Sequence, residues 1–171
     1  KKQDNFDRFF DGTSSQKQVF EDTKYLVQSA VDGYNVCIFA YGQTGSGKTF
    51  TIHGDEANPG LQPRAMKELF NILDRDSNKF SFEVEVYMLE LYQDQLMVSV
   101  QGAVVKSVAD YQSFISLVND GMKNRHVAAT KMNADSSRSH LILSVIVKSV
   151  NHQTQFNIVG LFSFGVLAGS V

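Results

Sequence analysis

The segment Gly42–Thr49 constrains the fold of this 171-residue chain more than any other part of it. Its pattern, G-x-x-x-x-G-K-[ST], lets successive backbone N–H groups curl around a phosphate. The lysine supplies a positive charge for terminal phosphates, and the last hydroxyl can join the coordination shell of Mg²⁺. The pattern therefore predicts a phosphate-binding loop made of Gly42, Gln43, Thr44, Gly45, Ser46, Gly47, Lys48 and Thr49.

Both flanks of this loop have the composition that a phosphate-binding loop requires. The continuous apolar run Val36–Tyr41 before it predicts a strand buried on both faces, as in a parallel sheet. Cys37 lies within that run, and we expect it to be a small buried hydrophobic residue. Residues 48–53 after the loop predict the start of a helix, whose N–H groups and dipole favour bound anions. These flanks argue against a glycine-rich turn that matches by chance.

The composition narrows the class of protein. Hydrophobic residues make up 43% and charged residues 20%, which is typical of one globular domain of this length. The net charge of −2 gives no general attraction for nucleic acid or for an anionic membrane. One cysteine excludes an internal disulfide framework, and no secretory signal is recognisable. The longest apolar stretch, near residues 158–168, is shorter than the ~20 residues of a membrane span. We expect a soluble intracellular protein with neither nucleic acid nor membrane as partner.

Hydrophobic periodicity predicts helices alternating with strands, which indicates an α/β sandwich in a single unit. Residues 6–10 predict a short strand or its end, residues 97–105 a short strand-like segment, and residues 130–140 a polar loop. The predicted helices cover residues 19–31, 61–73 and 108–122, and the predicted longer strands cover residues 80–88, 141–147 and 156–168.

Three stretches, in this order along the chain, resemble the kinesin motor domain. They are Tyr34–Thr49, then Asn124–Thr130 leading to Asn133 and Ser136–His140, and finally Leu167–Ser170. Leu91–Asp94 and Phe6-Asp7 match further landmarks of the family. The amino-acid sequence from Gln18 to Thr49 is most similar to that of plant calmodulin-binding kinesins of the minus-end-directed class. The resemblance covers nearly the whole chain.

This resemblance implies a P-loop NTPase-type α/β fold, a three-layer sandwich whose central β-sheet is flanked by helices. It implies that Gly42–Thr49 binds the phosphates of ATP or ADP, with Phe50 near the adenine. Residues 136–140 would form switch I, in which Ser137 would hold Mg²⁺ together with Thr49. Ser137, Arg138 and, in switch II, Gly169 would act on the terminal phosphate. The implied partner is the microtubule, and the implied location is the cytoplasm, on the cytoskeleton.

The chain lacks several parts of the family pattern. Nothing matches the initial R-x-R-P motif, and the resemblance implies a missing segment between Leu96 and Met97. The sequence stops at Val171, before the family's principal microtubule-binding loop and helix. We therefore expect residues 1–171 to form a partial kinesin motor domain, an incomplete motor core.

The switch II motif also lacks its acids. The family pattern D-L-A-G-S-E aligns with residues 166–171, where Val166 and Val171 replace both carboxylates. In phosphate-loop enzymes the first acid holds the Mg²⁺ water shell. By the resemblance, the second pairs with Arg138 and helps to order the attacking water. Valine can do neither, so whether this chain is an active ATPase is uncertain on sequence grounds.

Four readings remain open at this point. The chain is an ATP-driven microtubule motor domain in fragmentary or divergent form, or a kinesin-like nucleotide-binding or interaction module without motor activity. The third is an unrelated phosphate-loop enzyme such as a small kinase, against which the residues before and within switch I argue. The fourth is a mistaken or truncated gene product with aggregation-prone strand edges. The missing acids favour the second reading for this chain, whereas a kinesin motor that binds ATP and microtubules is still the best description at the level of the family.

Overall fold

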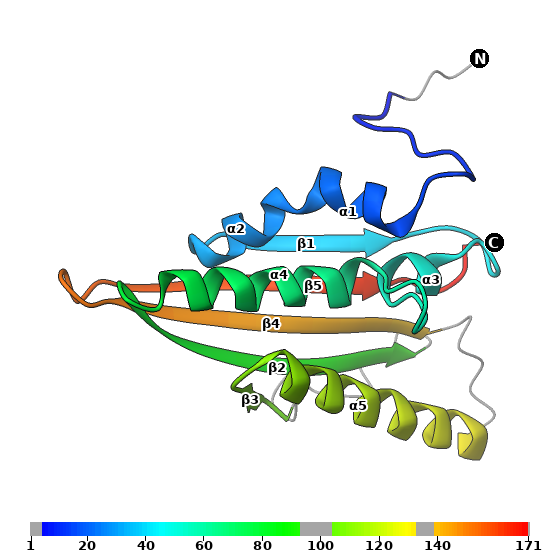
Figure 1. Cartoon of the computed structure of the whole chain (residues 1–171). Helices are drawn as coiled ribbons and strands as arrows, with labels where there is room; N and C mark the ends of the chain where they lie inside the picture. The colour runs from blue at the N-terminus through cyan, green and yellow to red at the C-terminus, as the bar shows by residue number, and fades with distance from the viewer. Residues whose placement is uncertain (1–4, 93–103, 133–138, 171) are drawn as a thin grey trace.

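The computed structural model describes residues 5–92, 104–132 and 139–170, which form a mixed sheet with helices packed against it (Figure 1). The strands lie in the order β1-β5-β4-β2-β3. β1 runs parallel to β5, and the other pairs of neighbours are antiparallel. The strands are β1 (Asn35–Ala40), β2 (Phe80–Tyr92), β3 (Lys106–Val108), β4 (Ser139–Asn151) and β5 (Asn157–Val166).

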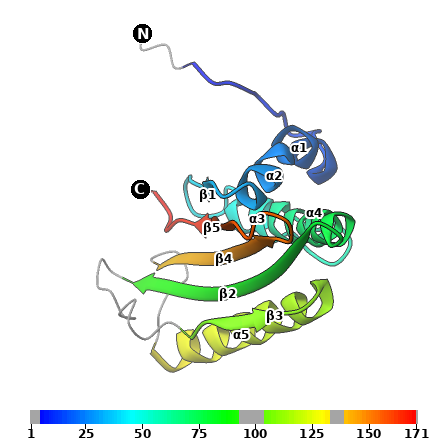
Figure 2. The same ribbon diagram turned by 90° about the vertical axis from the view of Figure 1, so that its left-hand side faces the viewer.

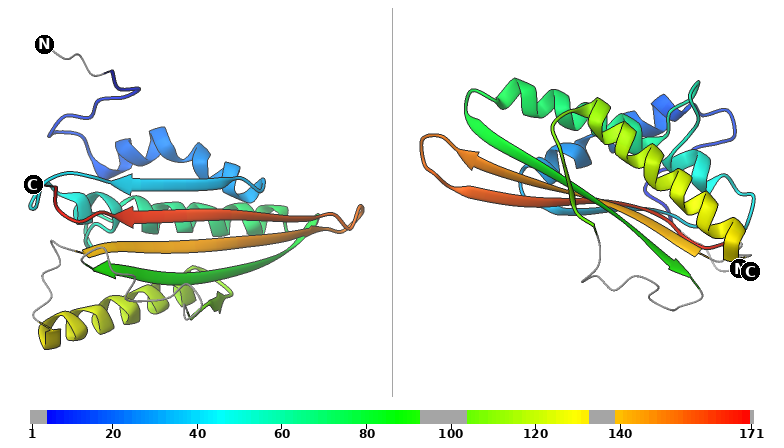
Figure 3. Two further views of the ribbon diagram at one scale, coloured as in Figure 1. Left: turned by 180° about the vertical axis from the view of Figure 1, so that it is seen from behind. Right: turned by 90° about the horizontal axis from the view of Figure 1, so that it is seen from below.

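All the described helices lie on one face of the sheet, as the views from behind and from below show (Figure 3). They are α1 (Gln16–Thr23), α2 (Tyr25–Val31), α3 (Lys48–Ile52), α4 (Leu61–Asp76) and α5 (Tyr111–Met132). The predicted class, a β-sheet flanked by helices, is confirmed. Of the three predicted layers, the described residues form the sheet and one layer of helices.

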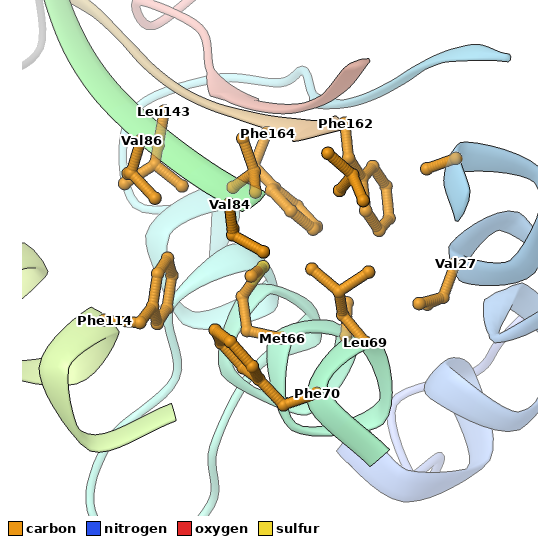
Figure 4. Close-up of a cluster of buried hydrophobic side chains, with 14 of the residues drawn as sticks. Val27, Met66, Leu69, Phe70, Val84, Val86, Phe114, Leu143, Phe162 and Phe164 are labelled. Carbon is orange, nitrogen blue, oxygen red and sulfur yellow. The ribbon is translucent and has the colours of Figure 1, made fainter. Parts of the chain in front are cut away.

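The hydrophobic core lies between this helical layer and the sheet (Figure 4). On α4 the apolar side chains recur at helical spacing, so Met66 and Leu69 are fully buried. Alternate residues of the strands point into the same layer, among them Phe162 and Phe164, whose ring centroids are 4.5 Å apart. The core thereby holds α3, the helix that follows the phosphate loop, against β1, the strand that precedes the loop.

The opposite face of the sheet is not covered by any helix that the structure describes, and this corrects the prediction for residues 36–41. Cys37 is exposed, and Phe39 keeps 51% of its surface accessible. The error arose because a continuous apolar run is typical of strands covered on both faces, whereas the described helices cover only one. Ser144 of β4 and Ser163 of β5 are both buried, and their hydroxyls lie 2.8 Å apart and satisfy each other.

Three other elements differ from the prediction. The helix expected over residues 19–31 is divided at Lys24, where the Thr23 hydroxyl donates to the carbonyls of Val19 and Phe20 and competes with backbone bonding. Residues 6–10 form no strand, because this segment runs away from the sheet (Figure 2). The last helix continues to Met132, beyond the predicted boundary at 122. Of the predicted strand at 97–105, residues 97–103 lie outside the described part, and 104–105 are irregular.

Gly160 of β5 supports the close approach of α2 to the sheet, and this gives a first prediction. A Cβ atom at this position would collide with the backbone carbonyl of Ala30, which cannot turn aside as a side chain can. We expect Gly160→Ala to lower the free energy of unfolding by about 1–3 kcal/mol. Chemical denaturation monitored by circular dichroism measures the change. Gly12→Ala is the matched control, because a Cβ there has open space around it. Equal stability of the two variants would contradict the prediction.

Candidate functional site

The loop that follows β1 has the backbone geometry that the glycine pattern predicted. Gly42, Gly45 and Gly47 have φ values of +152°, +82° and +87°, which L side chains rarely adopt. A Cβ atom on Gly45 or Gly47 would have no neighbour within 4 Å, so the loop is open there. At Gly42 a Cβ would approach the Ser46 hydroxyl to 2.7 Å, so a side chain there would displace Ser46, and the positive φ itself favours glycine. The loop therefore offers an open, glycine-lined surface at the start of α3.

The Lys48 side chain lies across this loop. Its Nζ donates to the carbonyl oxygens of Gly42 at 2.8 Å and Gln43 at 2.9 Å. Because an ammonium group carries three donors on a flexible stem, it can exchange such carbonyl contacts for phosphate oxygens. The structure thus places the one charged side chain of the predicted loop directly over the loop's backbone.

The short helix α3 carries two further predicted residues, Thr49 and Phe50, both exposed. The Phe50 side chain keeps 49% of its surface accessible, so an aromatic face is free to contact a planar group. The Phe50 carbonyl accepts a 2.6 Å hydrogen bond from Gln16 Nε2 of α1, and Gln16 is only 9% exposed. Sequence reasoning missed Gln16, because a glutamine in the first turn of a helix has no distinguishing pattern. It fixes α3 against α1.

The segment after β5 lies beside the phosphate loop. The Leu167 N–H donates to the Ala40 carbonyl, and the Ser170 N–H donates to the Gly42 carbonyl, both at 3.1 Å. The Ala168 N–H donates to His140 Nδ1 at 3.0 Å. The fold therefore brings the predicted Gly169 next to the loop, although 120 residues of sequence separate it from Thr49.

Val166 ends β5 in register with Ala40 of β1 and Leu141 of β4. It is half-buried and packs against the hydrophobic core. The position that the resemblance assigns to the first switch II acid therefore carries an apolar side chain, located where β1 passes into the phosphate loop. An isopropyl group there accepts no hydrogen bond from a water molecule and provides no negative charge.

Some predicted site residues lie outside the described part of the chain. These are Ser137, Arg138 and Val171. Of the motif that ends at His140, the structure describes Ser139, which is buried, and His140, which reaches the segment after β5. In the ranges that the structure covers, no three His, Cys, Asp or Glu side chains lie close enough together to hold a metal ion. No helix of those ranges is long and apolar enough to cross a membrane.

A scan of protein families matches this chain to the kinesin motor domain over residues 1–97 and 95–171. Kinesin-like protein KIN-14I of Oryza sativa subsp. japonica is 51% identical over 191 aligned positions, which include 99% of this chain. Kinesin-like protein KIN-14E of Arabidopsis thaliana is 53% identical over 192 positions, again with 99% of the chain. The chain spans 15% of the length of each of these relatives.

Among solved structures, one described as that of a fast kinesin superimposes with a TM-score of 0.91 at 30% sequence identity. The match covers 97% of this chain and 54% of that structure. This chain and that kinesin structure therefore share one fold. From the family match and the two plant relatives, the chain belongs to the kinesin motor domain family.

Proposed function

We propose that this chain binds ATP and ADP, with Mg²⁺, at the loop Gly42–Thr49. The observation that carries the proposal is the Lys48 ammonium group, held over an open glycine-lined loop at the start of α3. Backbone N–H groups of such a loop bind phosphate oxygens, and the lysine neutralises the terminal phosphates. Thr49 and Ser137 would hold the metal ion, and Phe50 would contact the adenine. Bound Mg²⁺ would neutralise negative charge on the β- and γ-phosphates.

We further propose that residues 1–171 correspond to part of a kinesin motor domain. The alignments with the two plant relatives extend over 191 and 192 positions, more than the 171 residues of the chain, so they contain gaps in it. The two stretches matched by the family model meet at residues 95–97. Both observations support a missing segment next to Leu96. The proposed cellular partner is the microtubule, with a location on the cytoskeleton in the cytoplasm.

The chemistry proposed for this chain is nucleotide binding with little hydrolysis. Val166 packs into the core at the position where the family pattern has an acid, and Val171 replaces the second acid in the sequence. Phosphoryl transfer depends on positioned charges, and valine supplies none. A kinesin-like nucleotide-binding or interaction module is accordingly the preferred description, and Gly169 would still offer a backbone N–H to a terminal phosphate.

Equilibrium titration of the purified chain with ADP and with a non-hydrolysable ATP analogue tests the proposal. We expect saturable binding of one nucleotide per chain that weakens when EDTA removes Mg²⁺, because the metal ion shields the phosphates. AMP should compete poorly, because it lacks the phosphates that Lys48 would contact. No saturable binding of either nucleotide at millimolar concentration would refute the proposed function.

A further inference from the structure

The segment Leu167–Ser170 is held by hydrogen bonds from three separate elements. Two backbone N–H groups of this segment donate to backbone carbonyls, those of Ala40 and Gly42. The third acceptor is a side-chain atom, Nδ1 of His140, which accepts from the Ala168 N–H at 3.0 Å. His140 is the second residue of β4, and it is half-buried. Among these three acceptors, His140 is the one that a substitution can remove.

The state of the His140 ring follows from this contact. A ring nitrogen that accepts a hydrogen bond carries no proton, so in the neutral ring the proton is on Nε2. The bond to the Ala168 N–H therefore needs an acceptor atom on residue 140 that lies two bonds beyond Cβ. That acceptor must point at the backbone of the segment after β5. A role as a metal ligand is not supported, because His140 joins no cluster of His, Cys, Asp or Glu within the described ranges.

Gly169 lies between the two amides that His140 and Gly42 hold. In the part of the chain that the structure describes, the Gly169 N–H itself makes no hydrogen bond. Bonds on both sides of a glycine restrict where its amide can lie, although glycine alone is the most freely rotating residue. The Gly169 N–H is therefore an available donor whose position beside the phosphate loop depends on the His140–Ala168 bond.

We propose that His140 is a positioning residue of the nucleotide site. By accepting from the Ala168 N–H, it holds the Gly169 amide where it can donate to the terminal phosphate of ATP. This rests on the proposed nucleotide binding at Gly42–Thr49. ADP lacks that phosphate, so loss of the His140 contact weakens binding of an ATP analogue more than binding of ADP.

Two substitutions at His140 separate this role from a general structural one. His140→Asn keeps an acceptor, because Oδ1 of asparagine is as many bonds from Cα as Nδ1 of histidine. His140→Leu fills similar space without an acceptor. If the leucine variant does not fold, His140→Gln takes its place in the experiment. The amide oxygen of glutamine lies one bond farther from Cα than Nδ1 of histidine, so it does not reach the same position. His152→Asn is the control: His152 contacts Ser81 and Asn78 at the other end of the sheet.

We expect His140→Leu to lower the affinity for the non-hydrolysable ATP analogue about fivefold, as for one lost hydrogen bond. The affinity for ADP should fall less than about twofold. His140→Asn should restore most of the affinity for the analogue. Without nucleotide, amide hydrogen exchange of Ala168 should accelerate in the leucine variant and stay slow in the asparagine variant, whatever the nucleotide affinity. The control should match the unmodified chain in both measurements.

Several results would overturn the proposal. These are equal losses for ATP analogue and ADP, failure of asparagine to restore binding, or unchanged exchange at Ala168 in the leucine variant. Absence of nucleotide binding by the unmodified chain would instead refute the proposed function, and this proposal with it. The two failures are distinguishable, because the exchange measurement needs no nucleotide.

Discussion

Steady-state phosphate release from this chain, at saturating ATP and microtubules, is expected to be at least about a thousandfold slower than from a kinesin motor domain that carries both switch II acids. Removing a single preorganised group from a transition-state site costs about 10²–10³ in rate, and this chain lacks two. One of the two positions, Val166, is a half-buried apolar side chain packed against the core.

Among the described residues, the strand partners of Val166 supply no acid in its place. Its register partners are Ala40 and Leu141, which are apolar as well. With valine there, nothing at this position would hold the water shell of a bound Mg²⁺ ion. The bound nucleotide would then keep its contacts with the loop while the attacking water lacked its orienting groups. Binding and hydrolysis are therefore expected to separate in this chain.

A coupled phosphate-release assay, run beside a reference kinesin motor domain, measures this difference. Controls without microtubules and with the Lys48→Ala variant set the background. Microtubule-stimulated turnover at the rate of the reference domain would show that the two carboxylates are dispensable for hydrolysis. Val166→Asp with Val171→Glu is an informative companion, because it returns a carboxylate to both positions.

The glycine loop and the order of elements around it were predictable, because each is determined by local chemistry. Positive φ values require glycine at Gly45 and Gly47, and an apolar run before such a loop indicates a strand. Helix α4 was equally clear, because Ala65, Leu69 and Leu73 recur every four residues. These signals lie within a few residues of the structures that they determine.

Features that depend on contacts across the fold could not be predicted from one sequence. The exposure of Cys37 follows from which face of the sheet the helices cover. The bond between Ala168 and His140 joins residues 28 positions apart, and that between Gln16 and Phe50 joins residues 34 apart. Neither pair has a local pattern that distinguishes it from ordinary polar surface residues. The candidate site was thus predictable in its loop and not in the contacts that hold the loop's neighbours in place.

Replacing Lys48 by alanine is expected to lower the affinity for Mg²⁺-bound ATP and ADP about 100-fold. Hydrogen bonds to charged groups contribute about 1.5–3 kcal/mol each, and about 1.4 kcal/mol corresponds to a tenfold change in affinity. A phosphate contact of Lys48 would replace its present bonds to the Gly42 and Gln43 carbonyls, so only part of each gain is net. One to two such net contacts account for the expected loss.

Lys48→Met separates the charge of the side chain from its bulk, since methionine keeps an unbranched stem of similar length. We expect Lys48→Met to lose as much affinity for the nucleotides as Lys48→Ala does, because the apolar stem does not contact phosphate. Lys67→Met on the exposed surface of α4 is the matched control and should bind as the unmodified chain does. Circular dichroism must show that all variants keep the helices and sheet. Unchanged affinity in both Lys48 variants would mean that Gly42–Thr49 is not the nucleotide site, because no other charged side chain lies within that loop.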